Sequence, residues 1–508
     1  MNKTAKTIRT VALAAIAAGA ICPTAATAAD VVFPNADASG NLMSVTAWGG
    51  TVPTTDRPKI TKGGTYYADP NGTLAGINIG TTGRVVFDMT KSTQAEPTIT
   101  MGANFDVSGV GHNVNVEFVG GTWDFQGSYR IDKGQWGAYY GNTVRLDGCN
   151  MTNMTHIGFT YAANGQAPTE WTLDNGSTLH ANGNFKPDND GRSAVHVNVN
   201  GGSRILVGDY MMLGYSSGNI SASQTADQTV IVSGTGSLLK FGKSNNVSYV
   251  GEKFCNTLLE ARDGGEINRV AGDFVIGGGA YATNNVVRAV GTGSVATLGN
   301  LIFGYSGAAS GNRVEALDGA EVTASYVTFS KGRDNGFACS NATITIRQFV
   351  QGANVTNSFV HVQGNAPKVI LSQSGVTQPN NLKQGFRLIF DLPPDGYAYA
   401  NAGDCPIVAY STQPNSGFDA TSAIEINGIK EYKAGMARRG VRKERVKLAY
   451  IDTSDYYGLS DIDAIIAGWN ATMPEGATLC TTGRNSADRN RSIYLEVKLD
   501  SPTVLSFR

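Results

Sequence analysis

Two phrases in this chain repeat each other loosely, with their shared GTGS motif 57 residues apart. The first, VSGTGSLLKFG, begins at Val232, and the second, VGTGSVATLGNLIFGYSG, begins at Val290. Each leads into another shared phrase, NTLLEARDGGEI after the first and NRVEALDGAEV after the second. Such repetition indicates structural units that stack on their neighbours, because a short unit cannot bury an apolar face alone.

The long period divides into two similar halves, each with two strands of alternating apolar and polar residues around a tight corner. The inward residues expected in the second strands include Leu238 and Val295. The anchor residues that follow the corners are spaced by 26 to 33 residues: Thr122, Asn150, Ser177, Ser203, Gly236, Gly265, Gly293 and Ala320.

Stacked units of this kind predict an all-β fold, a parallel β-helix (solenoid) whose coils lie ~4.8 Å apart. A β-propeller would need about four strands in each blade of ~45 residues and a repeated blade signature, and neither is visible. A β-sandwich array is the other alternative.

Residues 1–29 are typical of an export signal. Basic residues precede the apolar run from Val11 to Ile21, and Ala26 and Ala28 provide a small-residue cleavage site. Cys22 would suit a lipoprotein, but Ile21 stands where a small residue is expected. No later run is long enough for a transmembrane helix, for which ~18 apolar residues are needed. We therefore expect an exported protein, extracellular or at a bacterial cell surface, with no transmembrane segment in the mature chain.

Charge and cysteine content exclude several kinds of partner. A formal net charge of −1 gives no general attraction to nucleic acid. The cysteines form no CxxC pair, and the histidines show no metal-ligand spacing, so we expect no metal and no cofactor. Cys405 and Cys480 are a candidate disulfide, because export favours oxidation. Two separate buried thiols are the alternative.

The repeated phrases, together with DFVIGGGAYATNNVV, resemble the short repeats associated with autotransporter (type V secretion) and PEP-CTERM surface proteins. The resemblance is clearest over residues 195–330. It implies an exported right-handed β-helix displayed at a bacterial surface, and it brings no catalytic residues. It does not extend to the C-terminus: too little chain follows residue 380 for a full membrane barrel, and no sorting tripeptide with its apolar helix is present.

The sequence becomes richer in charged residues after Gly385. We therefore predict four parts: a signal peptide (1–29), N-terminal capping coils (30–110), β-helix repeats (111–380) and a separate β-rich C-terminal cap domain (381–508). A cap is expected because an open solenoid end exposes unpaired backbone. This part contains a short helix expected at 460–470 and a basic run, 430–447. This basic run could bind an anionic polysaccharide or a phosphate group. The alternative is a solvated strand or hairpin face that binds no ligand.

Catalytic residues are not evident. Glu260 and Glu315 are expected two coils apart, near the upper limit for an inverting glycosidase pair, with Arg288 between them. A surface ladder of alternating charge explains the same three residues. The sequence does not decide whether the protein is an enzyme, and it favours a protein that is not one.

The sequence therefore predicts an exported non-enzymatic structural or adhesin-like β-helix protein. The alternative is a β-helix protein that binds or degrades polysaccharide, for which outward aromatic residues on adjacent coils would be the distinguishing feature. Glycans or other cell-surface proteins are the expected partners. The candidate glycan contacts are Tyr210, Tyr215, Tyr249, Tyr281 and Tyr305, with half-buried packing residues as the alternative reading.

Overall fold

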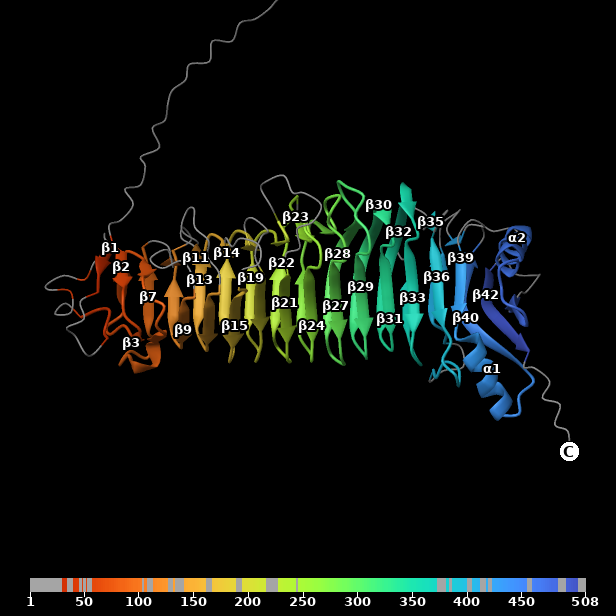
Figure 1. Ribbon diagram of the computed structural model, residues 1–508, viewed down its shortest axis with the longest axis horizontal. Helices are drawn as coiled ribbons and strands as arrows, with labels where there is room; N and C mark the ends of the chain where they lie inside the picture. Colours follow the sequence, from red (N-terminus) through yellow and green to blue (C-terminus); the bar gives the residue numbers. More distant parts are fainter. Residues whose placement is uncertain are drawn as a thin grey trace, which may run out of the picture.

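The computed structural model describes residues 30–33, 40–44, 48, 52, 57–102, 105–106, 113–126, 131–132, 141–160, 167–188, 194–215, 227–243, 245–371, 381–382, 386–399, 404–411, 417–418, 423–454, 459–482 and 490–500. The expected export signal lies outside these residues. The described chain forms a rod in which successive coils follow one another from the N-terminal to the C-terminal end (Figure 1). It is a parallel β-solenoid, so the predicted fold class is confirmed.

The first face of the solenoid is one 14-stranded sheet that contains one strand from each successive coil. All of its described pairings are parallel. Its strands are β3 (Gly64–Tyr66), β6 (Val85–Asp88), β9 (Asn115–Val119), β12 (Thr143–Asp147), β15 (Thr169–Asp174), β18 (Val195–Val199), β21 (Gln228–Ser233), β24 (Leu258–Arg262), β27 (Val286–Val290), β29 (Arg313–Leu317), β31 (Gly336–Ser340), β33 (Phe359–Gln363), β36 (Arg387–Asp391) and β39 (Ala423–Asn427).

The second face follows the corner at the end of each of these strands. Its strands are β4 (Gly72–Leu74), β7 (Thr98–Met101), β10 (Thr122–Asp124), β13 (Asn150–Met154), β16 (Thr178–Ala181), β19 (Arg204–Val207), β22 (Leu238–Phe241), β25 (Glu266–Arg269), β28 (Val295–Phe303), β30 (Glu321–Arg333), β32 (Thr343–Thr356), β34 (Lys368–Leu371) and β37 (Ile407–Ser411). The 3-10 helix η1 (Met89–Lys91) lies at one early corner.

The third face is made of β1 (Asp30–Val32), β2 (Arg57–Ile60), β5 (Ile77–Ile79), β8 (Phe105–Asp106), β11 (Ile131–Asp132), β14 (Ile157–Thr160), β17 (Phe185–Asp188), β20 (Met212–Leu213), β23 (Val247–Val250) and β26 (Asp273–Ile276). In three successive coils one long strand, β28, β30 or β32, spans both the second and the third face, and the first half of β28 pairs with β25 and its second half with β26. Strands β1 to β17 of this face form one sheet, and a bridge between Phe185 and Met211 connects it to β20, β23 and β26.

The core runs along the axis of the rod because every strand turns alternate side chains inward. Val287 and Ala289 are fully buried on β27, as the alternation predicts. Stacked coils place like residues above one another, and Phe303, Phe329 and Phe349 form a stacked column with ring centroids 4.9 and 5.9 Å apart. Fully burying each such side chain contributes about 1.5–3 kcal/mol.

The corners between the first and second faces need left-handed backbone. Asp263 and Asp318 have φ of 54°, and Gly291 has φ of 84°, conformations that aspartate tolerates and glycine adopts without strain. Beneath the corners, small side chains tie coils together: the Ser177 hydroxyl accepts a hydrogen bond from the backbone N–H of Cys149 at 3.1 Å. Each corner is thereby connected to the next coil.

The register expected for some second strands is wrong by one residue. Leu239 pairs with Ile267, and Ile267 pairs with Ala296, so Leu239 and Ala296 are inward and the expected Leu238 and Val295 are not. The GTGS corners contain one residue more than the DGG and DGA corners, which shifts the alternation beyond them.

The described residues of the C-terminal region continue the solenoid, and a separate cap domain beginning at residue 381 is not shown. Strands β36, β37 and β39 add further parallel coils, and β40 (Lys443–Ser454) still pairs in parallel with β37. Among the described strands only the pairings of the last one are antiparallel: β42 (Asn490–Asp500) pairs with β40 and with β41 (Ala477–Thr482). A small parallel pair, β35 (Asn381–Leu382) and β38 (Gly417–Phe418), lies nearby in the sequence.

Two helices lie at this end of the rod (Figure 1). Helix α1 (Ile429–Arg438) occupies the start of the basic run, and helix α2 (Leu459–Asn470) confirms the helix expected at 460–470. No helix among the described residues is long and apolar enough to cross a membrane.

Candidate functional site

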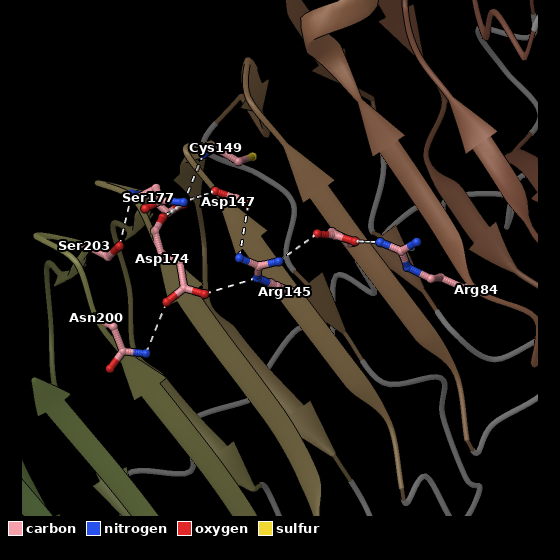
Figure 2. Close-up of polar contacts among 10 residues, drawn as sticks. Arg84, Arg145, Asp147, Cys149, Asp174, Ser177, Asn200 and Ser203 are labelled. Atoms are coloured by element: carbon pink, nitrogen blue, oxygen red, sulfur yellow. Dashed lines mark hydrogen bonds and ion pairs between the residues drawn. The ribbon is translucent and has the colours of Figure 1, made fainter.

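The first face presents a ladder of paired charges along the axis. Arg145 on β12 contacts Glu117 on β9 and Asp174 on β15, both at 3.1 Å, and Asp147 on its own strand at 3.2 Å (Figure 2). Arg84 forms a further ion pair with Glu117. Opposite charges therefore alternate from coil to coil, as cross-strand pairs do in stable sheets.

The predicted charge ladder of Glu260, Arg288 and Glu315 is confirmed in its contacts. Arg288 Nη1 donates to Glu260 at 3.3 Å and Arg288 Nε donates to Glu315 at 2.6 Å. Arg313 adds a second contact to Glu315 at 2.8 Å. The guanidinium lies between the two carboxylates, in the space that a glycosidic bond would have to occupy in a two-carboxylate hydrolase.

The predicted tyrosines lie along the third face, in two groups. Lys186 on β17 joins the first group, with its ammonium 5.3 Å from the Tyr210 ring centroid and 4.6 Å from that of Tyr215. The Tyr210 hydroxyl accepts a hydrogen bond from Asn184 at 2.9 Å. Both rings are half-buried, and these cation–π contacts fix them against the coil.

The second group is Tyr249, Tyr281 and Tyr305. Burial is the main cause that raises the pKa of Tyr249 to about 12, and the neighbouring Glu252 and Tyr305 contribute. Tyr281 and Tyr305 stand in loops beside the strands and are 48% and 46% exposed. Tyr249 is therefore a packing residue, whereas Tyr281 and Tyr305 offer their rings to solvent.

Backbone contacts hold the loops of adjacent coils together. Ser306 N donates to Gly278 O at 2.8 Å, and Gly278 N donates to Gly251 O at 2.9 Å. The packing is close enough that a Cβ on Gly307 would lie 2.2 Å from the backbone nitrogen of Ala280. The glycines at these positions thus bring the loop backbones of neighbouring coils into close contact.

The five tyrosines do not form one straight row of strand residues. Only Tyr249 lies on a strand, and the positions in register with it on the neighbouring strands are mostly apolar: Met212, Val275, Ile302, Thr328 and Val350, of which Val275 is fully buried. We call Tyr210, Tyr215, Tyr249, Tyr281 and Tyr305 the tyrosine edge, because the four tyrosines outside the strands flank the third-face strands that include Tyr249.

Residues missed from the sequence complete the tyrosine edge. No register was predicted for the strands of the third face, so neither Lys186 on β17 nor the residues in register with Tyr249 were identified from the sequence. Tyr326 on β30, 39% exposed, also faces outward on the third face.

The proposed disulfide is not formed, and both cysteines are free thiols. Cys405 precedes β37 and Cys480 lies on β41, and strands β40 and β42 lie between these two strands. Three strand spacings amount to ~14 Å, whereas a disulfide needs Cα atoms within ~7 Å. The antiparallel return of β42 separates the two residues.

Among the described residues, no group of three or more histidine, cysteine, aspartate or glutamate side chains is arranged to hold a metal ion. Comparisons with protein-family models, with curated proteins and with solved structures find no match. The function of the chain therefore has to be inferred from its own surface.

Proposed function

We propose that this chain is an exported, non-enzymatic, adhesin-like β-solenoid. The observation that carries the proposal is the contrast between its surfaces. Charged side chains of the first face pair with one another, as Arg288 does with Glu260 and Glu315, whereas the loop tyrosines of the third face stay exposed. A rigid rod that presents such an edge suits attachment to an extended partner.

Glycan is the ligand class that the tyrosine edge favours. Exposed aromatic rings pack against the apolar faces of sugar rings and bury large area at small entropic cost. The edge extends over consecutive coils ~4.8 Å apart, a geometry that matches a polymer. This favours a protein that binds polysaccharide over one that degrades it.

A glycan array probed with the purified mature protein tests the proposal. We expect binding to a subset of polysaccharides and no release of reducing ends from any of them. The double variant Tyr281→Ser/Tyr305→Ser should lose binding, whereas the control Val270→Ser, an exposed apolar residue beyond β25, should keep it. Turnover of any glycan would overturn the non-enzymatic assignment, and no binding to any glycan would overturn the ligand class.

Export is a separate part of the proposal. It rests on the basic, apolar and small-residue pattern of residues 1–29. N-terminal sequencing of protein recovered from cells should begin at Ala29 or Asp30. Recovery of intact Met1 would contradict export by this route.

A further inference from the structure

A pocket at the C-terminal end of the rod is distinct from the tyrosine edge. It has a volume of about 290 Å³ and lies between the loop after β36, helix α1 and strand β40. Tyrosine rings, carboxylates and two cationic side chains line it, including Tyr397, Tyr399, Asp404, Glu444, Arg445 and Lys447. This volume is just below the range of about 300–1,000 Å³ for drug-sized ligands, which limits the occupant to a small molecule or one unit of a polymer.

The aromatic walls are rigid because their hydroxyls are already used. Tyr397 donates to the backbone oxygen of Asp391 at 3.2 Å, and Tyr399 donates to that of Pro367. Their ring centroids are 6.0 Å apart. Burial raises the pKa of both phenols, so they stay uncharged at neutral pH. The rings therefore act as fixed apolar surfaces.

Cations behind the lining hold the carboxylates. Lys368 contacts Asp404 at 3.4 Å. Arg439 contacts both Glu444, at 3.0 Å, and Asp395, at 3.1 Å. Each contact fixes the direction of one carboxylate oxygen and offsets its charge. Polar acceptors of fixed geometry, without a large net charge, are therefore set beside the tyrosine rings.

The donors come from strand β40. Arg445 and Lys447 are two residues apart and so point to the same side of the strand, toward β42, whereas Glu444 points to the other side, toward α1. Arg445 contacts Glu496 only at 3.7 Å, beyond normal hydrogen-bond distance, and the Lys447 ammonium lies 4.4 Å from the Tyr494 ring centroid. The pocket thus combines N–H donors, carboxylate acceptors and aromatic surface within the space of one small ring.

We propose that this pocket binds one uncharged sugar residue. Hydroxyl groups of a sugar both donate and accept, which matches the mixed lining, and its C–H face matches the tyrosine rings. An acidic sugar would bring another carboxylate toward Asp404 and Glu444, and like charges at short range are unfavourable. The site does not depend on the tyrosine edge, because four strand steps from β28 to β37 separate them by ~19 Å along the axis.

Titration of the mature protein with methyl glucoside, methyl galactoside, methyl mannoside, N-acetylglucosamine and glucuronate, followed by saturation-transfer NMR, tests the proposal. We expect at least one neutral sugar to bind in the millimolar range and glucuronate to bind more weakly. Asp404→Asn and Arg445→Gln should each weaken binding about tenfold, because each removes a charged hydrogen-bond partner. The control Lys443→Gln, on the same strand but not in the pocket lining, should bind as the wild type does.

Circular dichroism and thermal unfolding of each variant identify any loss of fold. If Asp404→Asn unfolds, Arg445→Gln still tests the proposal, because the Arg445 side chain is half-exposed. The Tyr281→Ser/Tyr305→Ser protein should retain this binding, so failure here and failure of the tyrosine edge are distinguishable. No neutral sugar bound at ~50 mM, far above the millimolar range of weak affinity, would overturn the proposal. Preference for glucuronate, or unchanged binding by folded Asp404→Asn and Arg445→Gln proteins, would overturn it too.

Discussion

The first and third faces belong to the same coils, yet they use their outward positions in different ways. On the first face, Arg288 joins Glu260 and Glu315 across three successive coils, and the glutamates are 7% and 9% exposed beneath it. On the third face, Tyr281 and Tyr305 stand in loops with nearly half of their surface exposed. Inward positions are constrained by packing on both faces, so the difference lies in what each surface leaves for a partner.

The contrast shows where stability and binding are separated in a solenoid. A charge satisfied by its neighbouring coil holds the stack in register but has little left to offer a ligand. An exposed aromatic ring contributes little to the stack but much to a contact surface. Substitutions on the two faces should therefore affect different measurements.

The largest effect is expected inside the coil that both faces share. Ala289→Glu places a carboxylate at a fully buried position of the hydrophobic core, and we expect a loss of about 3–5 kcal/mol. Denaturant unfolding measures it. Thr323→Glu, at an exposed position, should stay within about 0.5 kcal/mol of wild type, and equal tolerance of both would mean that the inside and outside positions are misassigned.

Breaking the first-face ladder should come next. Arg288→Glu would set three carboxylates in a row and remove the contacts at 3.3 and 2.6 Å. We expect a loss of about 2–3 kcal/mol, more than an exposed pair is worth, because the glutamates are nearly buried. From the sequence alone this substitution would be expected to cost little, since position 288 is outward.

A double-mutant cycle of Arg288→Met with Glu315→Gln isolates the pair. Coupling of about 0.5–3 kcal/mol in unfolding free energy is expected for residues in contact. Strictly additive losses of unfolding free energy would show that the contact between Arg288 and Glu315 does not stabilise the fold. The contrast between the faces would then lose its energetic basis.

Alternation predicted the strands of the first face in the correct register, since Val230, Leu259, Val287 and Val314 are aligned as expected. It failed beyond the GTGS corners because periodicity cannot tell which residue of a corner is extra. The tyrosine edge was predicted by composition, but its geometry arises from loops stacked through Gly278 and Ser306. The C-terminal pocket was not predicted, because α1, β40 and the loop after β36 meet only in the folded chain.

A fourth prediction concerns a charge that belongs to neither pattern. Arg269, at the end of β25, is 3% exposed, and its Nε and Nη2 have no hydrogen-bond partner in the described chain. Burial lowers its pKa to about 10, with Asp273 acting in the opposite direction. Arg269→Met should stabilise the fold by about 1–3 kcal/mol, because it removes a charge that is costly to bury. Thermal unfolding checks this against Arg204→Met at an exposed position, and destabilisation by Arg269→Met would mean that the guanidinium has a bound partner.

The smallest effect separates a packing tyrosine from the exposed ones, and it appears only at alkaline pH. Tyr249 has a pKa raised from 10.0 to about 12 in the folded chain, mainly by burial. Below pH 10 the phenol is protonated in both the folded and the unfolded states, so its full contribution to stability is present. Between pH 10 and 12 the unfolded chain loses this proton while the folded chain retains it, so the free energy of unfolding falls as pH rises. Denaturant unfolding between pH 8 and 12 should therefore show a steeper decline for wild type than for Tyr249→Phe, with parallel curves below pH 10. Parallel curves over the whole range would mean that Tyr249 is as open to water as Tyr281 and Tyr305, and that it is a contact residue of the tyrosine edge and not a packing residue.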